Sequence, residues 1–166
     1  MSIDATKRQI VAIRDQIAAL ENGRSLSLQK AENKLRQANM KVRSDSADYE
    51  AEKIQYNTAL LQYERYQDLY QKDGLISLTD LEKRNLKLQE TRAKRTSAEN
   101  KLLMSQNERL NARIELSSLS AEYADKLAKA SSDLGAKESY LAEGRSEYSK
   151  LRNKRSNVEV RTRNHA

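Results

Sequence analysis

The chain has 166 residues, carries a net charge of +7 and contains no cysteine, proline, tryptophan or phenylalanine. The absence of cysteine excludes a disulfide framework and thiolate metal sites. Charged residues make up 33% of the chain and hydrophobic residues 37%, and this hydrophobic share is too low for an ordinary globular core. The abundance of Ala, Leu, Lys, Glu, Gln and Arg favours helix over disorder.

The first predicted element is a long helix over about residues 3–73. Ile3, Ile10 and Ile17 are seven residues apart, which is the spacing of a coiled-coil seam. Ile17 and Leu28 are eleven apart, so the register shifts there by a stutter. From that point the seam runs unbroken through Leu28, Leu35, Val42, Tyr49, Tyr56, Tyr63 and Tyr70, with Ala31, Ala38, Asp45, Glu52, Ala59 and Tyr66 as companions.

The helix is predicted to break at a tip of four residues, 74–77. Gly74 suits the left-handed position that closes a helix. Ser77 followed by Asp80 forms a capping box for the next helix, with Ile76 and Leu81 as its hydrophobic staple. Thr79 with Glu82 is an alternative box that begins two residues later.

A second helix is predicted over about residues 78–157. Its apolar residues form shorter groups whose members are seven residues apart. These groups are Leu81 and Leu88; Leu103 and Leu110; Leu116 and Tyr123; and Leu127, Leu134, Leu141 and Tyr148. Residues 158–166 alternate β-branched and polar side chains, which predicts an extended tail. Because the stop and start signals lie so close together, the two helices should fold back into a long antiparallel two-helix coiled-coil hairpin.

The sequence carries no motif for catalysis. His165 is the single histidine, and there is no glycine-rich phosphate loop, metal-ligand spacing or nucleophile motif. A two-helix hairpin also offers no concave pocket of the kind that enzymes use. We expect a protein that is not an enzyme and that has no cofactor and no metal site.

Two features leave alternatives open. The row of tyrosines could stack on nucleic-acid bases, although heptad spacing is more typical of a seam. From Arg145 onward seven Lys or Arg stand against two Glu. Such a cluster could bind nucleic acid or an anionic surface, or it could be a solvated helix end whose cations suit the helix dipole.

The stretch "RYQDLYQKDGLISLTDLEKRNLKLQETRAKRTSAENKL" resembles the hairpin tip of periplasmic adaptor, or membrane fusion, proteins of the hemolysin D type. The tip of that family reads R-x3-L-x6-S. Arg65 and Leu69 match its first two positions and Ser77 its third, with seven residues rather than six before the serine. Tyr70 has the motif's distance to Ser77, with Tyr66 then at the arginine position. The likeness covers about residues 28–160, and only its tip is specific.

The resemblance implies the adaptor hairpin of a tripartite secretion or efflux system. Its tip would dock to a TolC-like outer-membrane channel, its arms would pack side by side in a ring of adaptor copies, and further domains would reach an inner-membrane transporter. The implied partner-binding residues are Arg65, Tyr66, Leu69, Tyr70, Gly74, Leu75, Ile76 and Ser77.

The same resemblance implies a periplasmic location. Residues 1–20 do not look like a signal peptide, because Asp4, Arg8, Arg14 and Asp15 interrupt any apolar run, so a targeting segment would lie outside this chain. The main alternative is a generic antiparallel coiled-coil spacer or scaffold. Nucleic-acid binding is a third reading, and a steep salt dependence of binding would distinguish it.

Overall fold

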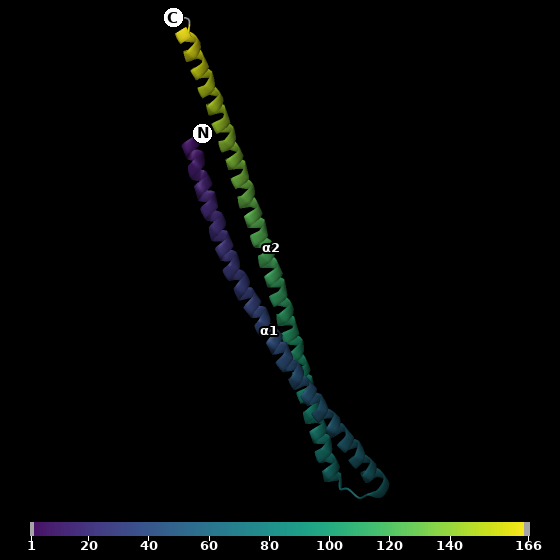
Figure 1. Ribbon diagram of the computed structural model, residues 1–166. Coiled ribbons are helices and arrows are strands. Elements are labelled where there is room, and N and C mark those ends of the chain that lie inside the picture. The colour runs from purple at the N-terminus through teal and green to yellow at the C-terminus, as the bar shows by residue number, and fades with distance from the viewer. Residues whose placement is uncertain (1, 165–166) are drawn as a thin grey trace. The chain divides into compact units, whose positions relative to one another are not determined.

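The computed structural model describes residues 2–164, apart from the side chain of Asp73. It contains two helices, α1 (Ile3–Asp73) and α2 (Leu78–Asn164), joined by a short turn (Figure 1). The two helices pack against each other, and no strand occurs among the described residues. The predicted all-α helical hairpin is therefore confirmed.

The chain forms two compact units, and each contains a stretch of both helices. The tip unit comprises residues 30–117 and includes the turn, whereas the terminal unit comprises residues up to 29 and from 118 onward. Within the tip unit, Lys34 pairs with Glu115 at 2.9 Å and Lys41 with Glu108 at 3.3 Å. Such exposed pairs add little stability each, but they show that α1 and α2 run antiparallel there.

The α1 seam of the tip unit is the side of the helix that becomes buried. Ala31, Val42, Asp45 and Ala59 are buried, and most of the other predicted seam residues are half-buried. Tyr70, next to the turn, is 38% exposed. The small alanines allow the two backbones to approach closely, so this narrow interface takes the place of a globular core.

The α2 seam differs from the one that its leucines predict. Leu103 and Leu110, which the spacing assigned to it, are 56% and 52% exposed. The half-buried and buried positions instead recur every seven residues through Leu81, Leu88, Arg95, Leu102, Arg109, Leu116 and Tyr123. Two of these positions are arginines, which interrupt the apolar pattern. The seam tolerates them because the long aliphatic stem of an arginine can cover the seam while its charged end stays in water.

The terminal unit contains the stutter. α1 remains helical through it, and Gly23 lies opposite Tyr123 of α2. A Cβ atom on Gly23 would come within 3.3 Å of the Tyr123 hydroxyl, which is hydrogen-bonded to Ser27 at 3.2 Å. The absence of a side chain therefore makes room for the tyrosine. Leu127, Leu134 and Leu141 are half-buried as expected, whereas Tyr148 is 65% exposed.

The predicted extended tail is wrong over residues 158–164, which continue α2 to Asn164. No glycine or proline interrupts this stretch, and Arg161 and Arg163 in the last turn suit the negative end of the helix dipole. Thr162 also donates its hydroxyl hydrogen bond to the carbonyl oxygen of Val158, at 2.8 Å. Local helical bonding thus outweighs the β-propensity of the valines. Residues 165 and 166 lie outside the described part of the chain.

Candidate interaction surfaces

The turn is closed by its own backbone chemistry. Gly74 adopts a φ of 56°, in the left-handed region that a glycine enters without steric cost. The Ser77 hydroxyl accepts a hydrogen bond from the Asp80 amide at 3.1 Å, and the Ser77 carbonyl accepts one from Leu81 at 3.1 Å. Ser77, rather than Thr79, is therefore the N-cap of α2.

Apolar side chains remain uncovered at this turn. Leu75 is 72% exposed and Leu78 is 53% exposed, whereas Ile76 and Leu81 are half-buried. The two staple residues are thus partly covered, whereas Leu75 is left largely uncovered. An exposed apolar group at the end of a hairpin is the kind of surface that a partner buries.

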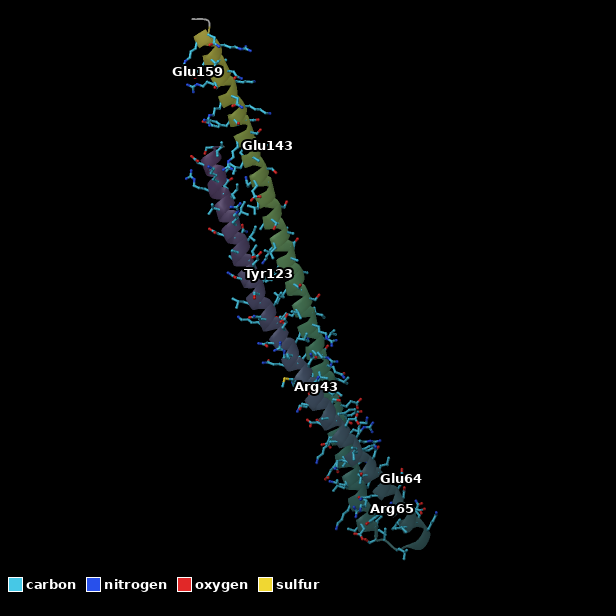
Figure 2. The ribbon with its side chains drawn as sticks, in the orientation of Figure 1. Arg43, Glu64, Arg65, Tyr123, Glu143 and Glu159 are labelled. Atoms are coloured by element: carbon cyan, nitrogen blue, oxygen red, sulfur yellow. The ribbon has the colours of Figure 1, made fainter. Side chains whose placement is uncertain are left out.

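Below the turn, Arg84 holds the two helices together. Its guanidinium donates hydrogen bonds to Gln62 at 3.0 Å and to the Tyr66 hydroxyl at 2.9 Å, and it stacks 4.4 Å from the centre of the Tyr66 ring. Tyr66 is therefore engaged within the hairpin. Arg65 is exposed on α1 close to the turn (Figure 2).

The residues implied by the family resemblance thus divide into two groups. Those that the hairpin partly covers are Tyr66, Leu69 and Ile76. Those that remain exposed are Arg65, Tyr70, Gly74, Leu75 and Ser77. The second group presents more of its surface to a partner than the first.

α1 carries a second, outward-facing row in the tip unit that the sequence reasoning missed. Its members are all exposed and uncharged, with alternating steps of four and three residues: Asn33, Gln37, Met40, Ser44, Ala47, Ala51, Ile54, Thr58 and Leu61. We name this row the α1 stripe. Met40, Ile54 and Leu61 are each more than 60% exposed. In a chain of which 33% is charged, an exposed row without charge is unexpected for a face that meets only water.

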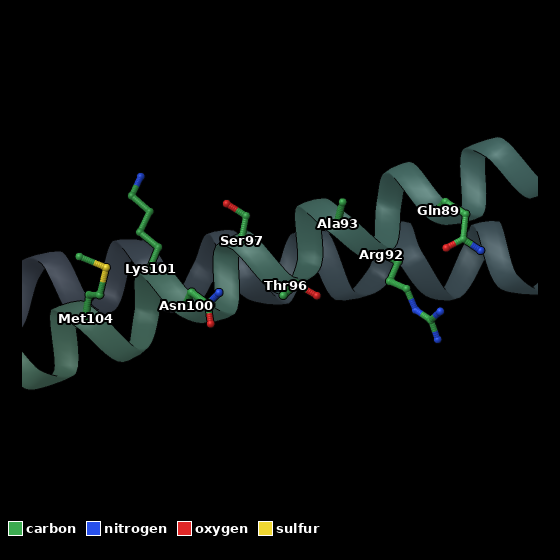
Figure 3. Close-up of a pocket in the computed structure, with 8 residues that line it drawn as sticks. All are labelled: Gln89, Arg92, Ala93, Thr96, Ser97, Asn100, Lys101 and Met104. Carbon is green, nitrogen blue, oxygen red and sulfur yellow. The ribbon is translucent and has the colours of Figure 1, made fainter.

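α2 carries a matching row, the α2 stripe, on the side opposite its seam. It comprises Leu86, Gln89, Ala93, Thr96, Asn100, Leu103, Asn107, Leu110, Ile114 and Ser117, all exposed and uncharged. A shallow hollow lies along its first half (Figure 3). All eight of the hollow's lining residues come from α2, including Ala93, Asn100 and Met104. The signal that identifies both stripes is the absence of charge at the outward heptad positions.

The seam itself is partly polar. Arg95 lies 5.0 Å from the Tyr56 ring centre, which repeats the pairing of Arg84 with Tyr66. These tyrosines are engaged within the hairpin, which favours the seam reading over a platform for bases. Asp45 is only 4% exposed, and its Oδ2 has no hydrogen-bond partner.

Little else in the structure points to a chemical site. A hydrogen bond from Lys126 to Glu122 raises the pKa of the Lys126 ammonium group, on the solvent-facing side of α2. Among the described residues, no cluster of His, Cys, Asp and Glu could hold a metal ion. Neither helix, over residues 2–164, has a stretch apolar enough to cross a membrane.

Comparison with known proteins identified no matching family model, curated protein or solved structure. Function is therefore inferred from the exposed side chains of the two units.

Proposed function

We propose that this chain is the non-catalytic adaptor hairpin of a tripartite secretion or efflux system. Its tip docks to a TolC-like outer-membrane channel in the periplasm, and its arms pack against neighbouring adaptor copies. The observation that carries this proposal is the exposure of Leu75, at 72%, on a turn in which Ser77 already caps the start of α2. Burial of a large apolar side chain by a partner contributes about 1.5–3 kcal/mol to the binding free energy. Such a contact is weak for one tip, but binding becomes strong when many copies bind together.

Replacing Leu75 with serine is expected to lower capture of a TolC-like channel at least about tenfold, because the apolar contact is lost. The measurement is binding of detergent-solubilised channel to the chain immobilised at high density, so that many tips can act together. Leu75 contributes nothing to the core of the tip unit, so helicity by circular dichroism should not change.

The matched control is Val11→Ser. Val11 is an apolar residue of the terminal unit, 56% exposed and far along α1 from the turn. It should capture the channel as the unchanged chain does. Equal capture by Leu75→Ser and Val11→Ser would contradict a docking tip.

The two stripes support the second part of the proposal. If the α1 stripe of one copy packs on the α2 stripe of the next, each copy offers two different surfaces, and the contact is head-to-tail. Such contacts close into a ring or continue as a chain of copies. Ala51 and Ala93 lie at the small positions of the two stripes, where helices approach most closely.

Glutamate at either position should therefore block every contact between identical copies. We expect the chain to be mostly monomeric at micromolar concentration and to form larger species in sedimentation at high micromolar concentration. Ala51→Glu alone or Ala93→Glu alone should remain monomeric. An equimolar mixture of the two should form a dimer and nothing larger, because each pair then retains one intact α1 stripe facing one intact α2 stripe.

The control is Asn57→Glu, in the row of α1 that already carries Arg43, Glu50 and Glu64 beside the stripe. It should assemble as the unchanged chain does. A mixture that stays monomeric, or single variants that assemble normally, would argue against packing through the stripes while leaving the tip untouched.

The second candidate is a generic coiled-coil spacer. The seam between α1 and α2, with buried residues such as Ala31 and Ala112, favours it because it joins the two arms without any partner. A spacer needs neither an exposed tip leucine nor charge-free stripes. Normal capture by Leu75→Ser together with normal behaviour of both stripe variants would support the spacer.

A further inference from the structure

The part of the tip unit nearest the turn has no buried side chain among the described residues. The last buried residue of α1 before the turn is Ala59, and the first buried residue of α2 after it is Leu88. Every described side chain between them is half-buried or exposed. We name residues 60–87 the tip segment. Because apolar burial contributes less there than further along the arms, polar contacts matter more for holding the two helices together.

Arg84 joins α2 to α1 within the tip segment. Its Nη1 donates a hydrogen bond to Gln62 Oε1 at 3.0 Å, and its Nη2 donates one to the Tyr66 hydroxyl at 2.9 Å. The guanidinium carbon also lies 4.4 Å from the centre of the Tyr66 ring. Among the described residues of this segment, no other hydrogen bond or ion pair between side chains links the two helices. Hydrogen bonds from a charged donor are stronger than neutral ones, so Arg84 supplies the main polar tie near the turn.

The shape of the guanidinium explains why an arginine suits this position. Its donors lie in a rigid planar fork, so bonds from two different nitrogen atoms fix both the distance and the rotation of Gln62 and Tyr66 relative to α2. The chain between Tyr66 and Arg84 contains the whole turn, including Leu75. The tie therefore closes the loop of chain that presents Leu75.

We infer that Arg84 is the positioning residue of the tip. By holding α1 against α2 where no described side chain is buried, it fixes the orientation in which Leu75 and Tyr70 are presented. A surface that is ordered before binding loses less conformational entropy when a partner docks, so the partner binds more tightly. The effect on docking rests on the proposed function of the tip, whereas the ordering of the tip segment does not.

Arg84 is less suited to contact a partner itself. The residue is half-buried, two of its nitrogen atoms already donate to α1, and its guanidinium stacks on the Tyr66 ring. A partner that bound Arg84 directly would first have to break these contacts. The two roles give different results, because a positioning residue changes the mobility of the free chain and a contact residue changes only binding.

The first measurement is amide hydrogen exchange of the full chain without a partner. Arg84→Met retains much of the apolar stem but removes every donor, and it should accelerate exchange in residues 62–72 and 81–87 about tenfold. Arg84→Lys should accelerate it similarly, because an ammonium group cannot replace the planar fork. Residues 30–59 should exchange as in the unchanged chain, which would show that the hairpin remains folded. The matched control is Arg92→Met, at an exposed arginine further along α2, and it should leave exchange in the tip segment unchanged.

The second measurement is capture of a detergent-solubilised TolC-like channel by the immobilised chain. Arg84→Met should capture it about tenfold more weakly, and Arg92→Met should capture it as the unchanged chain does. Unchanged exchange in Arg84→Met, or full restoration by Arg84→Lys, would overturn the inference. Equal or tighter capture together with faster exchange would also overturn it, because docking would then not need an ordered tip. If Leu75→Ser captures the channel normally, the proposed function fails, and the exchange measurement alone decides whether Arg84 orders the tip.

Discussion

Replacing Asp45 with alanine is expected to raise the free energy of unfolding of the tip unit by about 1–2 kcal/mol. Asp45 is 4% exposed in the seam, and its Oδ2 accepts no hydrogen bond. A buried carboxylate oxygen without a partner costs free energy on folding, and alanine also has the higher helix propensity. The midpoint of urea unfolding, followed by circular dichroism, should increase, and the slope of the unfolding free energy with urea concentration should change little.

The control for this prediction is Asp48→Ala. Asp48 is an exposed acid on the same helix, three residues further along. Its replacement gains the same helix propensity but relieves no buried oxygen, so its effect should be clearly smaller. If Asp45→Ala lowered the midpoint, the carboxylate would have to be stabilising the hairpin through an interaction that this structure does not contain.

Placing an acid at Ala112 is expected to have the opposite and larger effect. Ala112 is 2% exposed in the α2 seam. Ala112→Asp would put a short, uncompensated charge between the helices, at a cost of about 3 kcal/mol or more. The nearby lysines offer no ready compensation, because Lys34 and Lys41 already pair with Glu115 and Glu108. The urea midpoint should fall, and amide hydrogen exchange should accelerate in the tip unit.

Asn111→Asp provides the matched control, because Asn111 is adjacent and exposed. It adds the same charge to the same helix without burying it, so the urea midpoint should barely change. Equal effects of the two substitutions would show that the cost comes from added charge in general and not from burial in the seam.

Much of this hairpin can be read from the local pattern. The heptads of α1 are the simplest case: Leu28, Leu35 and Val42 predict the face that the structure buries. The turn is equally local, since Gly74 ends one helix with its left-handed φ and Ser77 caps the next with its hydroxyl. Both depend on interactions between residues close in sequence, and these leave strong periodic or positional signals.

The register of α2 needed the partner helix. Leu102 is in phase by sevens with Leu88 and Leu116, but the positions between them in that series are arginines, whereas Leu103 has a leucine seven residues later. Packing decides between them, because only one face of α2 can lie against α1, and Arg95 on that face settles over the ring of Tyr56. Because Arg95 and Arg109 occupy seam positions, the spacing of apolar residues alone does not show the heptad of α2.

The candidate surfaces divide in the same way. By itself the sequence determined that the chain is helical, that it turns at Gly74 and that the turn contains apolar residues, because these follow from propensity, capping and composition. Only the tertiary structure decided which apolar residues stay exposed, since exposure depends on what the other helix covers. It left Leu75 uncovered and turned the two stripes outward.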